Sequence, residues 1–266
     1  IAGEPVDMDP VLELAKSYGI PVVEDCAQAH GARYKGKLVG TLGKIAAFST
    51  MSGKHHATGP QGGVVFSRDA KLLTEAKRFA DRGKPFGLET STNVRAGLNL
   101  NGNELSAAIG RVQICRLREM IERRREIAQE IKGAISGLRG VHPGREAGGE
   151  GGVYWFMRLK VNTDVVSISK DDFAEAVKAE GIPVTNSYRH LPSESILFTE
   201  RCVFPGSDYP WGLPSYKGAI DRKFPCENAV KATEEHFILS IHEHFGSREI
   251  SDIAEAFKKV ESAYIN

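Results

Sequence analysis

An acidic and an amide side chain follow a short apolar run near the start of the chain. The predicted strand Ile20–Glu24 leads into D-C-A-Q-A-H-G at 25–31, where Asp25 and Gln28 carry polar groups. Ligands of open α/β sheets bind beyond the carboxyl ends of strands, so Asp25 could hold a ligand cation or a protonated ring nitrogen. An aspartate at this place could equally cap the turn that follows its strand.

A hydroxyl and a primary amine follow a second apolar run. Ser49 ends the run K-I-A-A-F-S at 44–49, Lys54 follows it in a loop, and glycines 59, 62 and 63 come before the next apolar run. A lysine between two buried strands could act as a covalent amine nucleophile, and Ser49 could donate to a phosphate. Taken singly, Lys54 could be a solvated surface lysine and Ser49 a strand end, and the glycines could simply build a turn.

Helices and short apolar strands alternate in the first half of the chain. We expect helices at 11–18, 69–82 and 104–138, and strands at 20–24, 44–49 and 63–67. This alternation is typical of an α/β domain with a mainly parallel sheet, whose strands are buried.

The second half predicts a smaller α+β domain after a glycine-rich loop at 146–152. Its expected elements are a strand at 154–161, a helix at 170–180, a strand near 184, an extended loop at 199–226, a strand at 237–241 and a helix at 249–264. We therefore place one domain at 1–138, including the long linking helix, and a second at 139–266.

Composition and charge exclude several classes of protein. The 266 residues carry a net charge of +1, and the arginines between 116 and 125 alternate with glutamates, so neither nucleic acid nor an anionic membrane is an expected partner. The four cysteines are scattered without metal-type spacing, which predicts reduced thiols and a cytoplasmic protein. We expect no membrane span and no signal peptide. The first residue is Ile1 rather than methionine, which suggests a truncated chain.

Taken together, the motifs resemble the DegT/DnrJ/StrS family of sugar aminotransferases, which belongs to the fold-type-I enzymes that use pyridoxal 5'-phosphate (PLP). The family carries E-D-x-A-Q-A-x-G, K-G-x-x-V-G, F-S, a following lysine and G-G; the corresponding positions here are 24–31, 35–40, 48–49, 54 and 62–63. The resemblance is close from Gly3 to about Leu138 and thinner from Val153 onward. Family members are substantially longer at the N-terminus, so we expect this chain alone to bind PLP poorly and to be inactive.

The resemblance implies a role for each matching side chain. Lys54 corresponds to the Schiff-base lysine and general base, and Asp25 to the partner of the pyridinium nitrogen. Gln28 corresponds to a residue that lies against the cofactor ring, and Ser49 to a phosphate ligand.

A further motif of the family, G-x-N-x-R, implies a homodimer in which an asparagine reaches the cofactor phosphate of the neighbouring subunit. Asn99 matches that asparagine, whereas Asn101 stands where the family has arginine.

Four weaker candidates concern the substrate. We expect His55 and His56 to line the mouth of the pocket and touch sugar or phosphate, and not to form a metal site, because adjacent side chains diverge. Tyr188 and His190 resemble part of the Y-x-P-L-H stretch near the family's substrate, although an ordinary strand end would look the same.

The leading hypothesis is therefore a PLP-dependent aminotransferase that moves an amino group from L-glutamate or L-glutamine to a nucleotide-linked keto-sugar. One alternative is a sugar dehydratase of the same family, which carries histidine in place of the lysine; His55 makes that register a question. The other is a non-catalytic or regulatory protein on the same fold. The sequence does not identify the sugar, the carbon aminated or the pathway.

Overall fold

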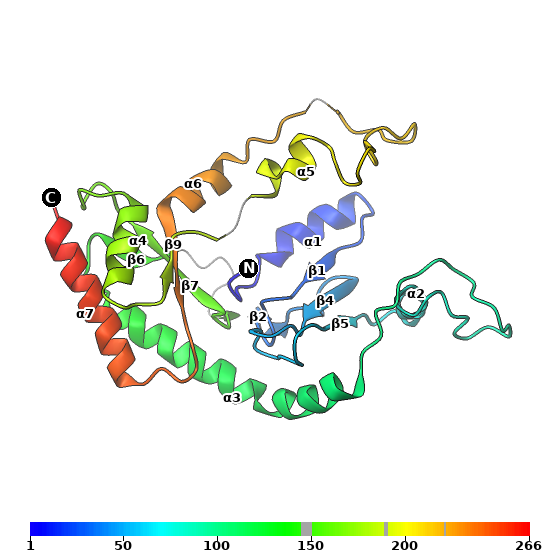
Figure 1. Ribbon diagram of the computed structural model, residues 1–266, viewed down its shortest axis with the longest axis horizontal. Coiled ribbons are helices and arrows are strands. Elements are labelled where there is room, and N and C mark those ends of the chain that lie inside the picture. Colours follow the sequence, from blue (N-terminus) through cyan, green and yellow to red (C-terminus); the bar gives the residue numbers. More distant parts are fainter. Residues whose placement is uncertain (145–150, 189–190, 221) are drawn as a thin grey trace. The chain divides into compact units, whose positions relative to one another are not determined.

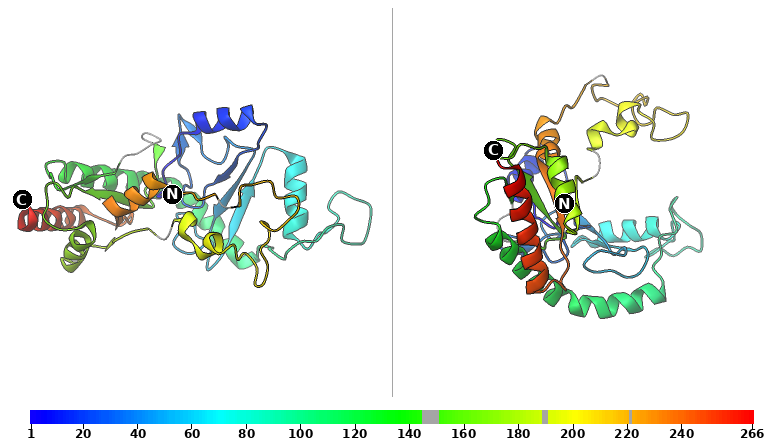
Figure 2. Two further views of the ribbon diagram at one scale, coloured as in Figure 1. Left: turned by 90° about the horizontal axis from the view of Figure 1, so that it is seen from above. Right: turned by 60° about the vertical axis from the view of Figure 1, so that its left-hand side comes forward.

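The computed structural model describes residues 1–144, 151–188, 191–220 and 222–266 (Figures 1 and 2). The chain forms two compact units. The first contains Ile1–Ala134, Arg145–Met157 (described from Gly151 onward) and Ser240–Ser251, and the second contains Ile135–Gly144, Arg158–Leu239 and Asp252–Asn266. Two short segments from the C-terminal half therefore fold with the first unit.

The first unit is built on a three-stranded sheet. Its helices and strands are α1 (Met8–Ser17), β1 (Val23–Asp25), β2 (Arg33–Tyr34), β3 (Lys37–Leu38), β4 (Ile45–Ser49), β5 (Gly63–Phe66), α2 (Ala70–Ala80) and α3 (Glu104–Ala134). The strand order is β1-β4-β5, with β2 and β3 forming a separate hairpin. β1 and β4 run parallel, as the sequence predicted, and β5 pairs with β4 in the antiparallel direction. Helix α1 lies beside β1 in Figures 1 and 2.

The expectation that these strands are buried was wrong for β5 and for most of β1, in which Val23 and Asp25 are exposed. Every residue of β5 is exposed, and about half of the surface of Val64 (50%) and Val65 (51%) is accessible. The physical reason is its place at one edge of the sheet, where only β4 pairs with it among the described residues. Helix α3 also ends earlier than expected, at Ala134 rather than near Leu138.

The core of the first unit lies beneath the motif at 24–31. Cys26, Ala29 and Ala46 pack with Ile121 of α3 and Val153, and Phe48 packs against this group. Gly31 has φ of 76°, and a Cβ there would lie 2.6 Å from Cδ1 of Ile121. The glycine of the motif is therefore required both by its backbone conformation and by the close approach of α3.

The second unit combines a four-stranded sheet with helices. Its elements are β6 (Val141–Pro143), β7 (Phe156–Val161), α4 (Lys170–Ala179), β8 (Val184–Thr185), η2 (Pro192–Glu194), α5 (Ile196–Thr199), α6 (Glu227–Glu235), β9 (His236–Ser240) and α7 (Ser247–Tyr264), of which β7, β9 and α7 begin or end in the first unit. The strand order is β6-β7-β9-β8. Phe173, Phe237 and Phe257 are fully buried and form its centre. The α+β character predicted for this region is thus present.

Capping residues explain where two helices begin. The carboxylate of Asp69 accepts hydrogen bonds from the backbone N–H groups of Lys71 and Leu72 at the start of α2. The hydroxyl of Ser169 accepts one from Asp172 at the start of α4. These contacts satisfy N–H groups that have no partner within the helix. Within the described residues, no helix combines the length and apolar character needed to cross a bilayer.

Candidate active site

The parallel pairing of β1 with β4 brings two of the predicted side chains, Asp25 and Ser49, to the edge of the sheet that is formed by the carboxyl ends of these strands. Asp25 is the last residue of β1 and pairs in register with Ala47 of β4, two residues before Ser49. The pairing continues with a 2.8 Å bond from Cys26 N to Ala47 O. Because the strands are parallel, their carboxyl ends face the same way, and Asp25 and Ser49 lie at the edge where ligands of such sheets bind.

Asp25 is exposed, and its side chain also caps the turn that follows β1, which was the alternative role considered for it from the sequence. Its Oδ1 accepts a 3.0 Å hydrogen bond from the backbone N–H of Ala27. Its Oδ2 makes no hydrogen bond to any described residue. One carboxylate oxygen thus fixes the turn, which leaves the other as an acceptor for a ligand.

Lys54 lies in the loop between β4 and β5, with its amine over an indole ring. Nζ is 3.9 Å from the ring centroid of Trp155, and the Trp155 indole N–H donates to Gly53 O at 2.9 Å. Burial lowers the pKa of Lys54, and the negative charge of Asp25 acts in the opposite direction. Lys54 and Asp25 are therefore close enough to interact electrostatically, and a partly desolvated amine is a better nucleophile at neutral pH.

The two ends of the loop that carries Lys54 approach each other closely at Thr50 and Gly62, which explains a glycine at position 62. Thr50 N donates to Gly62 O at 2.9 Å, and the hydroxyls of Thr50 and Thr58 lie 2.7 Å apart. A Cβ on Gly62 would lie 2.4 Å from Oγ1 of Thr50. A side chain at position 62 would therefore collide with the two threonine hydroxyls, so this position requires glycine. Half-buried Ser49 accepts a 3.4 Å bond from Met51 N, and its own hydroxyl hydrogen remains a possible donor.

Gln28 is tied to the beginning of the chain. Its Oε1 accepts a 2.8 Å hydrogen bond from the backbone N–H of Ala2. That contact orients the side-chain amide, so its NH₂ group is directed away from Ala2. The role expected for Gln28 beside a cofactor ring stays a prediction.

Asn99 belongs to a polar network away from these side chains. It pairs with Asp81 in an isolated β-bridge, and its Oδ1 accepts from Nδ2 of Asn101 at 2.8 Å. Asn101 also donates to Asp81 at 2.9 Å, and Lys84, Asn101 and Arg82 together lower the pKa of Asp81. No hydrogen bond joins Asn99 to Asp25, Ser49 or Lys54 within the described residues, so its predicted role across a dimer remains a prediction.

The expectation for the histidine pair was wrong for His55. This residue is only 2% exposed, and its Nε2 lies 3.0 Å from Val153 O. His56 instead lies 3.0 Å from Gly110 O through its Nε2. Adjacent side chains do diverge here, but His55 diverges into the core, where it cannot line the mouth of a pocket.

Tyr188 is the other described residue among the substrate candidates, and it lies in the second unit. Tyr188 lines a hollow of about 400 Å³ together with Ser169, Lys170 and Thr233. His190 lies outside the described residues. Tyr188 thus faces a hollow, and its role toward a substrate stays a prediction.

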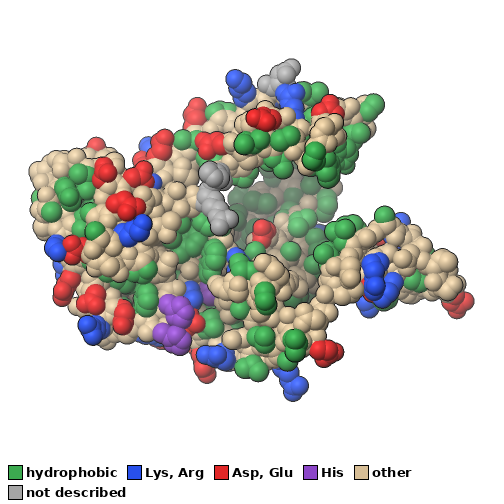
Figure 3. Space-filling view, viewed as in Figure 1, with side chains coloured by type: hydrophobic (Ala, Val, Ile, Leu, Met, Phe, Trp, Pro, Cys, Tyr) green, Lys and Arg blue, Asp and Glu red, His purple; other side chains and the backbone are tan. Residues whose placement is uncertain are grey.

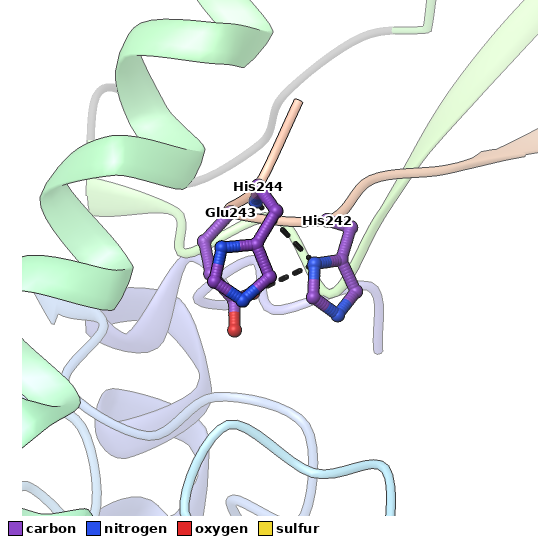
Figure 4. A group of neighbouring side chains, drawn as sticks. All are labelled: His242, Glu243 and His244. Carbon is purple, nitrogen blue, oxygen red and sulfur yellow. Dashed lines mark hydrogen bonds and ion pairs between the residues drawn. The ribbon is translucent and has the colours of Figure 1, made fainter. Parts of the chain in front are cut away.

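One group with metal-ligating atoms was missed by the sequence reasoning. The ligand atoms of His242, Glu243 and His244 lie within 4.8 Å of one another (Figure 4), and both histidines are exposed. Figure 3 shows a small group of histidine side chains, in purple, on the face that it draws. However, Glu243 accepts a 2.8 Å charged hydrogen bond from buried Arg124, which occupies the carboxylate with a positive partner. The guanidinium disfavours a cation at the same oxygen.

Trp155 was also missed, because nothing in its own neighbourhood of the sequence marks it. Its partners Gly53 and Lys54 lie about a hundred positions earlier in the chain. The only usable signal was its place in the apolar run V-Y-W-F-M at 153–157, directly after the glycine-rich loop.

Comparison with known proteins identifies relatives across most of the chain. Residues 1–258 match the DegT/DnrJ/EryC1/StrS aminotransferase family. The chain is 37% identical over 161 residues to the GDP-perosamine synthase of Escherichia coli O157:H7, an alignment that covers 60% of this chain and 43% of that protein. It is 30% identical over 276 residues to the L-glutamine:2-deoxy-scyllo-inosose aminotransferase of Streptomyces fradiae, covering 96% and 62% respectively.

The fold has counterparts among solved structures. The crystal structure of an aminotransferase from Psychrobacter cryohalolentis superposes with a TM-score of 0.81 at 25% sequence identity, covering 99% of this chain and 67% of that one. The chain spans less than two thirds of the length of the two curated relatives.

Proposed function

The chain belongs to the DegT/DnrJ/EryC1/StrS aminotransferase family, and we propose that the whole protein transfers an amino group from L-glutamate or L-glutamine to a nucleotide-linked keto-sugar with the help of PLP. The similar proteins support the substrate classes, because their names include a GDP-sugar synthase and a glutamine-dependent aminotransferase. We propose a cytoplasmic enzyme, in keeping with its free thiols. The 266-residue chain alone is expected to be inactive.

One observation carries this proposal. The parallel register delivers Asp25 and Ser49 to one sheet edge, and Lys54 lies close enough to Asp25 for that carboxylate to raise its pKa against the effect of burial. A primary amine, a carboxylate with an uncommitted oxygen and a hydroxyl are the donor set that fits PLP. Its aldehyde needs an amine, its ring nitrogen a carboxylate, and its phosphate hydrogen-bond donors.

Bound PLP supplies an electron-withdrawing ring that makes the α-hydrogen of the amino donor acidic. Lys54 would hold the cofactor covalently through Nζ and, once released as a free amine, move a proton to and from the substrate carbon. Asp25, through Oδ2, would keep the ring nitrogen protonated. Ser49 would donate its hydroxyl hydrogen to the phosphate. Gln28 would pack beside the ring.

The site favours an aminotransferase over a sugar dehydratase. A dehydratase would need a histidine where the aminotransferase has its lysine. His55 is buried against Val153 O, whereas Lys54 lies over the Trp155 ring, close enough to Asp25 for that carboxylate to act on its pKa. The buried position of His55 therefore supports Lys54 as the residue in the lysine register.

A homodimer is part of the proposal. Asn99 would reach the cofactor phosphate of the neighbouring subunit, and its amide is held by Asn101 in place of the arginine of the family motif. Sedimentation of the whole protein as a fully active monomer would contradict this assembly.

The visible absorption spectrum of the whole protein with PLP tests the function. We expect a yellow band that shifts on addition of L-glutamate and that is absent in Lys54→Ala. A band indifferent to amino acids, or release of a deoxy-keto-sugar without amino transfer, would favour the dehydratase. A protein that binds no PLP would favour a non-catalytic role.

A further inference from the structure

Trp155 makes two separate contacts with the loop that carries Lys54. The face of its ring lies 3.9 Å from Lys54 Nζ, and its indole N–H donates to Gly53 O at 2.9 Å. All three residues belong to the first unit. Because the Trp155 ring contacts the Lys54 ammonium and also donates to the adjacent carbonyl of Gly53, it restricts the positions that the amine can occupy.

The backbone on either side of Trp155 is itself fixed. Trp155 N donates to Ala2 O at 2.9 Å, and Val153 N donates to Gly3 O at 3.0 Å. Between them, buried Tyr154 has φ of 46°, a conformation that L-residues with side chains rarely adopt. Such a backbone persists only where the surroundings hold it, and it directs the next side chain.

Contacts with α3 hold Tyr154 in this conformation. Its carbonyl accepts a 3.2 Å bond from Arg124 Nη1, and its phenol oxygen accepts a 2.9 Å bond from Lys132 Nζ. The strained residue is thus anchored at both its main chain and its side chain. The orientation of the Trp155 ring is therefore a built feature of the first unit and not a free rotamer on its surface.

Among the described residues, the Lys54 ammonium contacts the Trp155 ring. Within the described part of the chain, no carboxylate lies within ion-pair distance of Nζ. The quadrupole of an indole attracts an ammonium above its face, and tryptophan does so best among the aromatic residues. The ring therefore stabilises the charged form of an amine whose pKa is lowered by burial.

We propose that Trp155 is a positioning residue for Lys54: its ring holds the protonated amine, within reach of the charge of Asp25, until the cofactor arrives. The amine would then leave the ring, lose a proton to water and form a carbon–nitrogen double bond with the aldehyde carbon of PLP, while the aldehyde oxygen leaves as water. This inference rests on the proposed function, in which Lys54 is the lysine that bonds to PLP. Trp155 itself forms no bond and transfers no proton. Its effect is to fix the place and the charge state of the nucleophile.

The test measures Lys54 in the whole protein after its PLP has been removed. An amine-selective acylating reagent is applied across a range of pH, and peptide mass spectrometry gives the rate of labelling at Lys54. Trp155→Leu keeps an apolar side chain but removes the aromatic face. We expect the midpoint of the Lys54 profile to fall by about half a pH unit, so that labelling below the midpoint is about threefold faster.

Two comparisons make the result specific. Lys77 lies 4.1 Å from the ring centroid of Phe86, so its labelling reports the reagent and should not respond to a change at Trp155. Trp155→Phe keeps a ring but lacks the indole N–H, and it should move the midpoint by less than half as much as leucine does. It also provides the test if Trp155→Leu does not fold.

A midpoint that is unchanged or rises in Trp155→Leu would overturn the proposal, since the ring would then only shield the amine from water. A change in the high-pH rate without a change in midpoint would overturn it as well, because it would report access alone. The measurement contains no cofactor, so it stands apart from the proposed function. If Lys54→Ala still bound PLP normally, the function would fail whatever the labelling profile showed.

Discussion

Replacement of Glu24 tests how the sheet edge is held in place. Glu24 is 7% exposed, and its carboxylate accepts three backbone hydrogen bonds: from Gly40 at 2.6 Å, Leu42 at 2.8 Å and Gly43 at 2.5 Å. These bonds fasten the loop that leads into β4 to the strand that ends in Asp25. Glu24 therefore acts one residue before the proposed site, on the segment that sets where β4 begins.

The size of the effect follows from the two carboxylate oxygens. In Glu24→Gln, one oxygen can still accept from Leu42 and Gly43, but the amide NH₂ replaces the oxygen that accepts from Gly40 and faces its N–H as a second donor. The loss of one charge-assisted bond in a buried place costs about 2 kcal/mol. Glu24→Ala leaves all three N–H groups without the carboxylate and should cost about 4 kcal/mol.

Amide hydrogen exchange measures this locally and does not require the two units to unfold together. In Glu24→Gln we expect the amide of Gly40 to exchange about thirtyfold faster and those of Leu42 and Gly43 to change less, whereas in Glu24→Ala all three should lose protection. Glu89 is exposed, so Glu89→Gln is the matched control that removes the same charge. Unchanged protection in Glu24→Gln, or equal loss in the control, would refute the reasoning.

Three further predictions concern the same unit. Burial lowers the pKa of His30 to about 4, with a further contribution from His56, and that of His55 to about 3. In the unfolded chain both histidines bind a proton near pH 6.5, whereas in the folded protein they stay neutral to a lower pH. The free energy of unfolding is therefore highest above pH 6.5 and falls toward pH 4 by roughly 1.4 kcal/mol per pH unit for each histidine. Denaturant unfolding at pH 7 and pH 5 measures the difference, and equal stability at the two pH values would contradict it. Ser49→Ala should weaken PLP binding by about tenfold in a spectroscopic titration, whereas Ser49→Thr should bind within about threefold of the unaltered protein; equal affinity of all three proteins would remove Ser49 from the phosphate site. Gly62→Ala should destabilise the first unit by about 1–3 kcal/mol, because the new Cβ would collide with Thr50. Gly133→Ala has open space around it and should be neutral or slightly stabilising. A thermal melt in which Gly133→Ala is the less stable variant would contradict this prediction.

The side chains that follow apolar runs were predictable from the sequence alone. Asp25, Ser49 and Lys54 each come after a strand whose hydrophobic residues are contiguous, and the parallel pairing of β1 with β4 places the first two at one edge. The hydrophobic pattern of a short strand is a local property, whereas its pairing direction is not, and β5 pairs antiparallel. This is why the α/β character and most element positions could be expected, even though β5 proved exposed.

The side chains whose role depends on distant partners could not be predicted. His55 is buried because Val153 O lies where its ring points, and Trp155 faces the loop because Tyr154 is anchored to α3. Neither contact leaves a pattern in a window of sequence. The hairpin of β2 and β3 was not predicted either; its turn residues Lys35 and Gly36 both have positive φ, 47° and 79°, as a two-residue turn of this kind requires.

Chemical trapping shows directly whether Lys54 carries the cofactor. The whole protein is incubated with PLP, reduced with borohydride and digested, and the modified peptide is identified by mass spectrometry. The account predicts a pyridoxyl group on Lys54, and no modification at that position when L-glutamate has first converted the cofactor. A pyridoxyl group on another lysine, or none on the yellow protein, would contradict it.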